Sequence, residues 1–129
     1  MINLYMDKKL ELSSNQAITN TAESENVIDF GVKQASAAGK HIDFRIKETF
    51  QGGTSLQFVL QDSEDGVSFT DKVTTPAFDA AALKASTGSP FYSIAIPKGL
   101  RRYIRINYVV SGAFTSGKIH AIMNTDIAV

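Results

Sequence analysis

Hydrophobic and polar residues alternate with a period of two along several stretches of the chain. The alternation runs through residues 42–47, 56–61, 93–96, 103–110 and 119–124. A period of two is typical of β-strands that pack one face against a core and turn the other face outward. The pattern therefore predicts a protein built mainly of short antiparallel strands.

Turn-forming residues separate these strands. The pair Gly52-Gly53 ends one alternating run, and Asp65-Gly66 lies between two apolar segments, which is a strong hairpin signal. Short strands with turns about every 8–12 residues are typical of β-sandwiches and β-barrels. We therefore predict an all-β, antiparallel fold.

Two segments do not follow the alternating pattern. Residues 13–25 are polar and rich in Ser, Thr and Asn, so we expect an extended loop after a short first strand at residues 10–12. Residues 77–85 are long enough for one or two helical turns. They follow Pro76 and are short, so we expect a crossing loop.

The chain has 129 residues, which suits one domain with its own core. We expect a single domain over residues 1–129, with residues 1–9 as an extended N-terminal arm. The absence of cysteine excludes a disulfide framework and a thiolate metal site. Residues 1–12 are too charged for a signal peptide, and no apolar run has the length of a membrane span. We therefore expect a cytosolic product without a membrane partner.

Charge is unevenly distributed, although the net charge is zero. Acidic residues outnumber basic ones in residues 1–79, whereas residues 80–125 carry six bases and no acid. This asymmetry allows two interpretations. The bases could form a face that meets an acidic partner or another copy of the chain. Alternatively, strands from the two halves pair in the fold and neutralise each other.

Residues 112–118 (GAFTSGK) match the phosphate-binding pattern G-x-x-x-x-G-K. The next residue is Ile119, where a phosphate-binding loop needs Ser or Thr to hold magnesium. Residues 119–129 also alternate like a strand, although a helix should follow such a loop. We therefore interpret the segment as a hairpin turn and expect no cofactor.

No combination of residues predicts a catalytic or metal site. His41 and His120 lack the spacing of paired metal ligands, so we expect packed or surface histidines. The acidic residues at 62–65 lack the spacing of a calcium loop, and no G-x-S-x-G nucleophile motif occurs. We expect no enzymatic activity, although the sequence alone leaves paired carboxylates for glycoside hydrolysis open.

Three arginines surround an aromatic residue at Arg101, Arg102, Tyr103 and Arg105. Such a segment can bind nucleic acid by neutralising phosphates and stacking on bases. A charged strand edge that prevents aggregation explains the same residues, and we favour this second interpretation.

Three stretches carry a resemblance to a known family. They are residues 26–31 (NVIDFG), residues 60–70 (LQDSEDGVSFT), and residues 96–119 with IPKG, RYIRINY and TSGKI. In this order they resemble the capsid cement, or decoration, proteins of tailed phages, the group typified by the Bordetella phage cement protein. The resemblance covers the chain from about residue 10 onward.

This resemblance implies a jelly-roll-type antiparallel β-sandwich on the outer capsid surface of a phage or prophage head. It implies a non-enzymatic structural protein, made in the bacterial cytoplasm, that stabilises the capsid by bridging major capsid subunits. The expected partners are the major capsid protein and further copies of the chain in a homotrimer. We expect no catalytic, cofactor or metal site, and neither nucleic acid nor a small molecule as ligand.

A second resemblance leaves an alternative function. Ser63 and Asp65-Gly66, followed by an aromatic residue and then by residues 102–105, are also similar to discoidin and carbohydrate-binding jelly rolls. A lectin-like carbohydrate-binding module is therefore the alternative.

Residues 13–25 and 74–90 are the segments that we expect to project and contact partners, because they lack core periodicity and exceed ordinary connection lengths. If charge complementarity orients the neighbours, raising the salt concentration should weaken assembly. The candidate partner-contact residues are Gln16, Thr19, Thr21, Ser24, Phe78 and Leu83.

Overall fold

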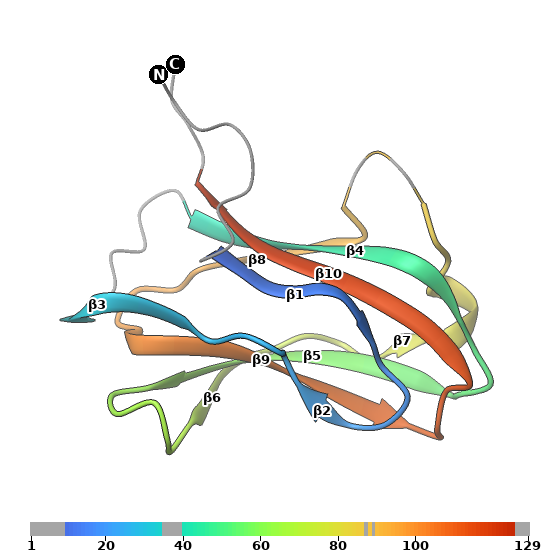
Figure 1. Ribbon diagram of the computed structural model, residues 1–129, viewed down its shortest axis with the longest axis horizontal. Coiled ribbons are helices and arrows are strands. Elements are labelled where there is room, and N and C mark those ends of the chain that lie inside the picture. Colours follow the sequence, from blue (N-terminus) through green and yellow to red (C-terminus); the bar gives the residue numbers. More distant parts are fainter. Residues whose placement is uncertain (1–9, 35–39, 87, 89, 126–129) are drawn as a thin grey trace.

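Two antiparallel sheets pack face to face in the computed structural model, which describes residues 10–34, 40–86, 88 and 90–125 (Figure 1). The four-stranded sheet has the order β1 (Glu11–Ala17), β10 (Ser116–Thr125), β4 (Lys40–Gln51) and β8 (Tyr92–Ala95). The six-stranded sheet has the order β2 (Ala22–Glu23), β9 (Arg101–Ser111), β5 (Ser55–Ser63) and β6 (Thr70–Thr74). In that sheet β3 (Ile28–Gln34) also pairs with β9, and β7 (Phe78–Asp79) also pairs with β5.

The strand order is that of a jelly roll. Since β2 and β3 both pair with β9, and β6 and β7 both pair with β5, each of these two pairs acts as one interrupted strand. If β2–β3 and β6–β7 each count as one strand and the strands are renumbered from 1 to 8 along the chain, the order is 1-8-3-6 in the four-stranded sheet. In the other sheet the order is then 2-7-4-5. Successive strands pass back and forth between two antiparallel sheets, as in jelly rolls. The all-β, jelly-roll-type prediction is therefore confirmed.

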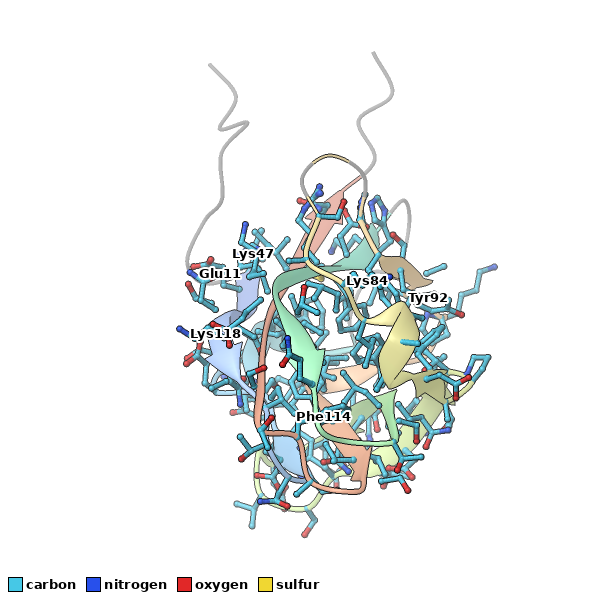
Figure 2. The ribbon with its side chains drawn as sticks, turned by 90° about the vertical axis from the view of Figure 1, so that its right-hand side faces the viewer. Glu11, Lys47, Lys84, Tyr92, Phe114 and Lys118 are labelled. Atoms are coloured by element: carbon cyan, nitrogen blue, oxygen red, sulfur yellow. The ribbon has the colours of Figure 1, made fainter. Side chains whose placement is uncertain are left out.

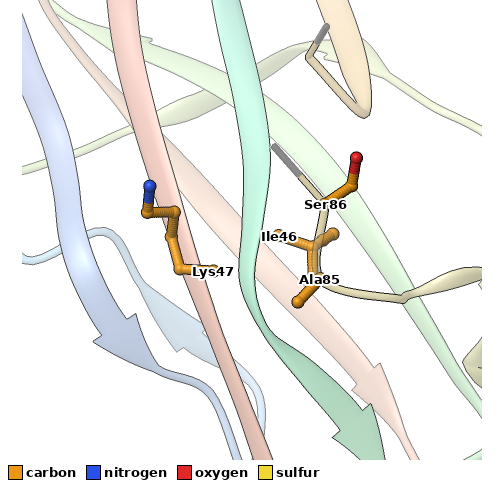
Figure 3. A pocket seen from close by; sticks show the side chains of 4 residues that line it. All are labelled: Ile46, Lys47, Ala85 and Ser86. Carbon is orange, nitrogen blue, oxygen red and sulfur yellow. The ribbon is translucent and has the colours of Figure 1, made fainter. Parts of the chain in front are cut away.

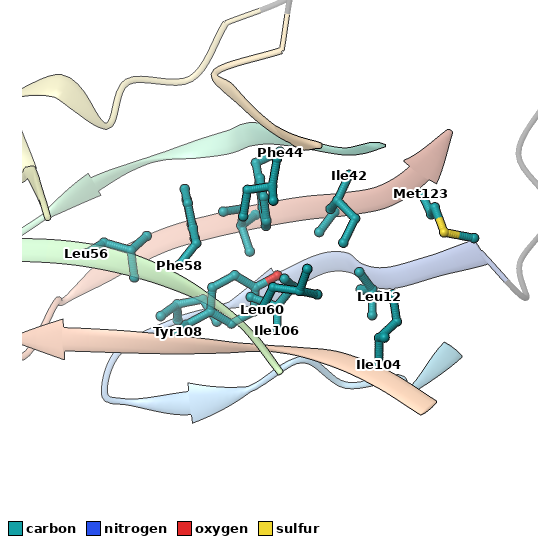
Figure 4. Packing of buried hydrophobic residues seen from close by; sticks show 14 of the residues in the cluster. Leu12, Ile42, Phe44, Leu56, Phe58, Leu60, Ile104, Ile106, Tyr108 and Met123 are labelled. Carbon is teal, nitrogen blue, oxygen red and sulfur yellow. The ribbon is translucent and has the colours of Figure 1, made fainter. Parts of the chain in front are cut away.

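The core lies between the sheets and is filled by the inward residues of the alternating runs (Figure 4). On β9, for example, Ile104, Ile106 and Tyr108 are fully buried. Phe44 of one sheet stacks on Phe58 of the other, with ring centroids 4.2 Å apart and planes 4° from parallel. This pair joins the two layers at the centre of the core.

The prediction of a polar loop over residues 13–25 is wrong in part, because β1 continues to Ala17 and β2 forms at Ala22–Glu23. The period of two is hidden because β1 contains two register shifts and Asn15 has a positive φ of 53°. Bulges of this kind change which face successive side chains occupy. An irregular strand of polar residues therefore resembles a loop in sequence.

Polar groups of this segment join the edge strand β1 to its neighbours. The Ser13 hydroxyl lies 2.7 Å from the buried Tyr108 hydroxyl of the other sheet. Glu25 accepts a hydrogen bond from the Ser14 N–H at 2.5 Å, and the Asn26 N–H donates to the Leu12 carbonyl at 3.0 Å. Burial raises the pKa of Tyr108, so its hydroxyl stays neutral in this contact. An otherwise open sheet edge is thus covered, as edge strands require.

Residues 77–85 form a crossing connection, as predicted, but one that contains local structure. It consists of the short strand β7 and the 3-10 turn η2 (Ala80–Ala82). Leu83 then enters the core, and its carbonyl accepts a hydrogen bond from the Phe50 N–H at 2.9 Å. The proposed arm at residues 1–9 lies outside the described residues.

We predict that Phe58→Ala lowers the free energy of unfolding by about 3–5 kcal/mol, because it removes a fully buried ring and leaves a cavity. Chemical denaturation monitored by circular dichroism measures this loss. The control, Val67→Ala, changes a side chain that is 80% exposed and should shift stability by less than about 0.5 kcal/mol. Equal effects of the two variants would contradict this description of the core.

Candidate functional site

Arg101, the first residue of β9, is held by a buried acid. Its guanidinium donates to Asp62 Oδ1 at 2.8 Å, and its backbone N–H donates to Asp62 Oδ2 at 2.9 Å. The Asp62 side chain is completely buried, and Lys72 Nζ lies 4.0 Å from it. Burial alone would raise the pKa of Asp62, but hydrogen bonds and charge from Arg101, with the charge of Lys72, lower it. Arg101 is therefore fixed to the fold.

The other two arginines of β9 also have acidic partners. Arg102 donates to both carboxylate oxygens of Asp29, at 2.7 and 3.0 Å, and this contact raises the pKa of Arg102. Arg105 lies 3.3 Å from a carboxylate oxygen of Glu23, and its guanidinium covers the Phe69 ring at 3.9 Å. The interpretation that the two halves of the chain neutralise each other is thus confirmed for these arginines. All three arginines of β9 therefore have acidic partners within the fold.

The segment 112–118 contains the turn from β9 of one sheet to β10 of the other, together with the first residues of β10. Its backbone N–H groups are already used, since Phe114 donates to the Thr19 carbonyl and Thr115 to the Gln51 carbonyl. The Gly117 N–H donates to the Glu48 carboxylate. These three donors are not available to a phosphate in this conformation. The prediction of a hairpin turn is wrong in part: the segment turns the chain, but β10 pairs with β1 and β4 and not with β9, so the turn connects the two sheets.

The acidic residues at 62–65 serve two separate structural roles. Asp62 pairs with Arg101, whereas Asp65 closes the β5–β6 turn. Asp65 Oδ1 accepts hydrogen bonds from the N–H groups of Val67 and Ser68, at 2.8 and 3.0 Å, and from the Ser63 hydroxyl at 2.8 Å. These donors lower the pKa of Asp65 to about 2. Nowhere in the described residues do three or more His, Cys, Asp or Glu side chains converge as a metal site.

Both histidines lie on the outer face of the four-stranded sheet. His120 Nε2 lies 2.8 Å from Glu11 Oε2, and both side chains are largely buried. His41 Nε2 lies 3.5 Å from Asp43 Oδ2. The Asp43 carboxylate also accepts hydrogen bonds from Ser93 and Asn124. The prediction of packed or surface histidines is confirmed, and each has an acidic neighbour.

Three of the proposed partner-contact residues are used inside the fold. Gln16 accepts hydrogen bonds from the Ser13 hydroxyl and the Glu25 N–H. Thr21 accepts one from the Val110 N–H at 2.9 Å, and the buried Ser24 hydroxyl accepts one from the Ile106 N–H at 3.1 Å. These side chains hold the segment after β1 against β9.

The remaining three candidates differ in exposure. Thr19 is exposed, so its contact with a partner stays a prediction. Phe78 is half-buried in an aromatic cluster with Phe91 and Tyr92, at centroid distances of 5.0 and 5.1 Å. Leu83 is fully buried, so its prediction as a surface contact is wrong. Leu83 is an isolated apolar residue in an irregular connection, so the sequence pattern did not show that it is buried in the core.

Two hollows on the four-stranded sheet were not predicted. The β4–β10 hollow, of about 280 Å³, is lined by Arg45, Lys47, His120, Ile122 and Asn124. The β4-edge hollow, of about 450 Å³, is lined by Ile46, Lys47, Ala85 and Ser86 (Figure 3). Alternation placed Arg45 and Lys47 on the outer face. It could not show that β10 and the segment after η2 flank them.

Comparison with protein families adds an identification to this geometry. The model of the Bbp16 family, a group of Bordetella phage proteins, matches residues 12–123. The chain belongs to the Bbp16 family. It is therefore a phage-associated protein, and the matched range runs from β1 to β10. No curated protein matches the chain.

The Bbp16 match covers the jelly roll described above. Within the part of the chain that the structure describes, no helix is long and apolar enough to cross a membrane. The arginines of β9, the turn at 112–118 and the residues that line the two hollows, except Asn124, lie inside the matched range.

We predict that Asp62→Ala lowers the free energy of unfolding by about 2–4 kcal/mol, because a buried carboxylate that holds a guanidinium and a backbone N–H is removed. The matched control is Asp29→Ala, which breaks a pair whose carboxylate is 43% exposed. It should cost less than about 1 kcal/mol. Urea denaturation compares the two variants, and equal losses would contradict the role of burial.

We also predict that the Asp65 carboxylate titrates near pH 2 in the folded protein. Because this pKa lies below the unfolded value of 3.8, its stabilising contribution is complete above that pH and is lost as the pH falls towards 2. Carboxyl NMR titration measures the midpoint. Ser63→Ala should raise it, whereas Ser68→Ala, which keeps the backbone donor, should not. A midpoint near 3.8 in the unmodified protein would refute the assignment.

Proposed function

We propose that this Bbp16-family protein is a non-enzymatic decoration protein of a phage head. It would sit on the outer capsid surface, bridge neighbouring major capsid subunits and stabilise the shell after its synthesis in the host cytoplasm. The observation that carries the proposal is the family match over residues 12–123. The resemblance of residues 26–31, 60–70 and 96–119 to capsid cement proteins supports it.

The internal bonding of the sandwich fits this mechanical role. Side chains from both layers meet in the core, and the Ser13 hydroxyl of β1 contacts the Tyr108 hydroxyl of β9 in the other sheet. Among the described residues, no buried side-chain nitrogen or oxygen lacks a hydrogen-bond partner. A clamp resists separation of the subunits beneath it only if its own layers stay together, and these bonds oppose their separation.

We further propose that the protein acts as a homotrimer. A stable protein contact buries about 1,200–2,000 Å² in total. Each partner supplies about half of that area, which is roughly a tenth of the 7230 Å² accessible surface of this domain. Linking three copies lets several weaker contacts act together through avidity.

The lectin alternative receives less support from the aromatic residues on the six-stranded sheet. Sugar-binding sites use exposed aromatic faces. Here the Arg102 guanidinium lies 5.0 Å from the Tyr103 ring centroid, and Arg105 lies 3.9 Å from that of Phe69. Arginine side chains of the fold itself therefore already lie over the rings of Tyr103 and Phe69.

We predict that the purified protein binds heads assembled without it and raises the temperature at which they break open. Sedimentation with undecorated heads measures binding, and light scattering of the free protein measures its mass. Binding that saturates at a fixed ratio to capsid subunits is the expected result. The control is the same protein mixed with heads that already carry a full complement of it.

Failure to bind undecorated heads would overturn the capsid proposal. A thermal shift with a panel of sugars, with no binding to heads, would favour the carbohydrate-binding alternative. A trimer mass without head binding would support self-association alone and would likewise contradict the proposed partner.

A further inference from the structure

Lys47 lines both hollows on the four-stranded sheet. The β4–β10 hollow extends from Lys47 over β10, and the β4-edge hollow extends from it towards Ala85 and Ser86. Figure 3 shows the Lys47 side chain on the β10 side of β4, with Ala85 and Ser86 on the opposite side. We call these two hollows, with Lys47 between them, the strip.

The cations around this strip differ from those on the other sheet. The three β9 arginines each contact an acid within the fold. By contrast, the structure records no ion pair in the described residues for Lys47 or for Lys118, and both are exposed (Figure 2). Arg45 has one guanidinium N–H on the Gly88 carbonyl, which leaves its other donors available.

The acids on the same face are already used as hydrogen-bond acceptors. Glu11 contacts His120, and Asp43 accepts from Ser93 and Asn124. Glu48 accepts from the Gly117 N–H. Glu11 and Asp43 are buried, whereas Lys47 and Lys118 are exposed. Glu48, opposite Lys118, is exposed as well, but neither Arg45 nor Lys47 has a recorded ion pair with it among the described residues.

We propose that this strip binds an acidic, extended peptide segment of the protein's partner, with a carboxylate side chain in the β4–β10 hollow. Lys47 and Arg45 would contact the carboxylate, and Lys118 would attract further acids nearby. A hollow of about 280 Å³ lies at the small end of ligand sites, which suits one side chain rather than a cofactor. The inference rests on the proposed function, since it names the chemistry of the capsid segment that this face would meet.

The test uses a decapeptide of alternating Glu and Gly, titrated into the isotope-labelled full chain at low salt. We expect amide shifts to change most at residues 45, 47, 118, 120 and 124, with weaker binding as salt rises. Lys47→Gln should weaken binding about three- to fivefold, the effect of one exposed ion pair. Lys98→Gln is the matched control, because it removes an exposed lysine from the connection between β8 and β9 and should leave affinity unchanged.

Equal weakening by Lys98→Gln would overturn the site, as would shift changes spread over all lysines or equal binding of a Lys-Gly decapeptide. The same variants on undecorated heads separate this inference from the proposed function. If unmodified protein and Lys47→Gln bind heads equally, the site fails while the capsid role stands. If the peptide binds the strip but no variant binds heads, the capsid role fails while the acidic-peptide site stands.

Discussion

The contact between Phe44 and Phe58 sets the geometry on which the rest of the protein depends. These rings come from different sheets and lie nearly parallel at 4.2 Å, so they fix the spacing of the layers at the centre. Around them, Phe78, Phe91 and Tyr108 approach Phe58 at larger angles. Tilted aromatic contacts add directional preference to burial, so the core specifies how one sheet is placed on the other.

The pairing of charges follows from the order of the strands within the six-stranded sheet. Because β9 lies between β5 and the β2–β3 segment, arginines from the basic half of the chain lie opposite acids from the acidic half. The sequence asymmetry therefore becomes local neutrality on the six-stranded sheet. On the other sheet, Lys47 and Lys118 are exposed and have no recorded ion pair within the described chain. The two outer faces therefore differ, because the β9 arginines are paired with acids and these two lysines are not.

The sequence allowed the regular strands and the sandwich to be predicted, since residues 103–110 and 119–124 alternate clearly. The turn at 112–118 was predicted as a hairpin, but strand pairing between distant segments places β9 and β10 in different sheets. The first strand was predicted only at residues 10–12, because register shifts remove the period of two from the rest of β1. The hollows were missed because one depends on the pairing of β4 with β10 and the other on the segment around residue 85, which contacts β4. Local pattern determines a strand, whereas a concave surface depends on the packing of segments distant in sequence.

The pairing of the first and last strands has a practical consequence. Glu11 lies opposite Ile122 in the register of β1 and β10, so the described fold begins and ends on neighbouring strands at one end of the same sheet. A peptide or fluorescent protein attached at residue 10 or at residue 125 would therefore leave the domain at the same end of that sheet. Joining these two positions through a linker and opening the chain at the β5–β6 turn would give a circular permutant that keeps this sheet continuous.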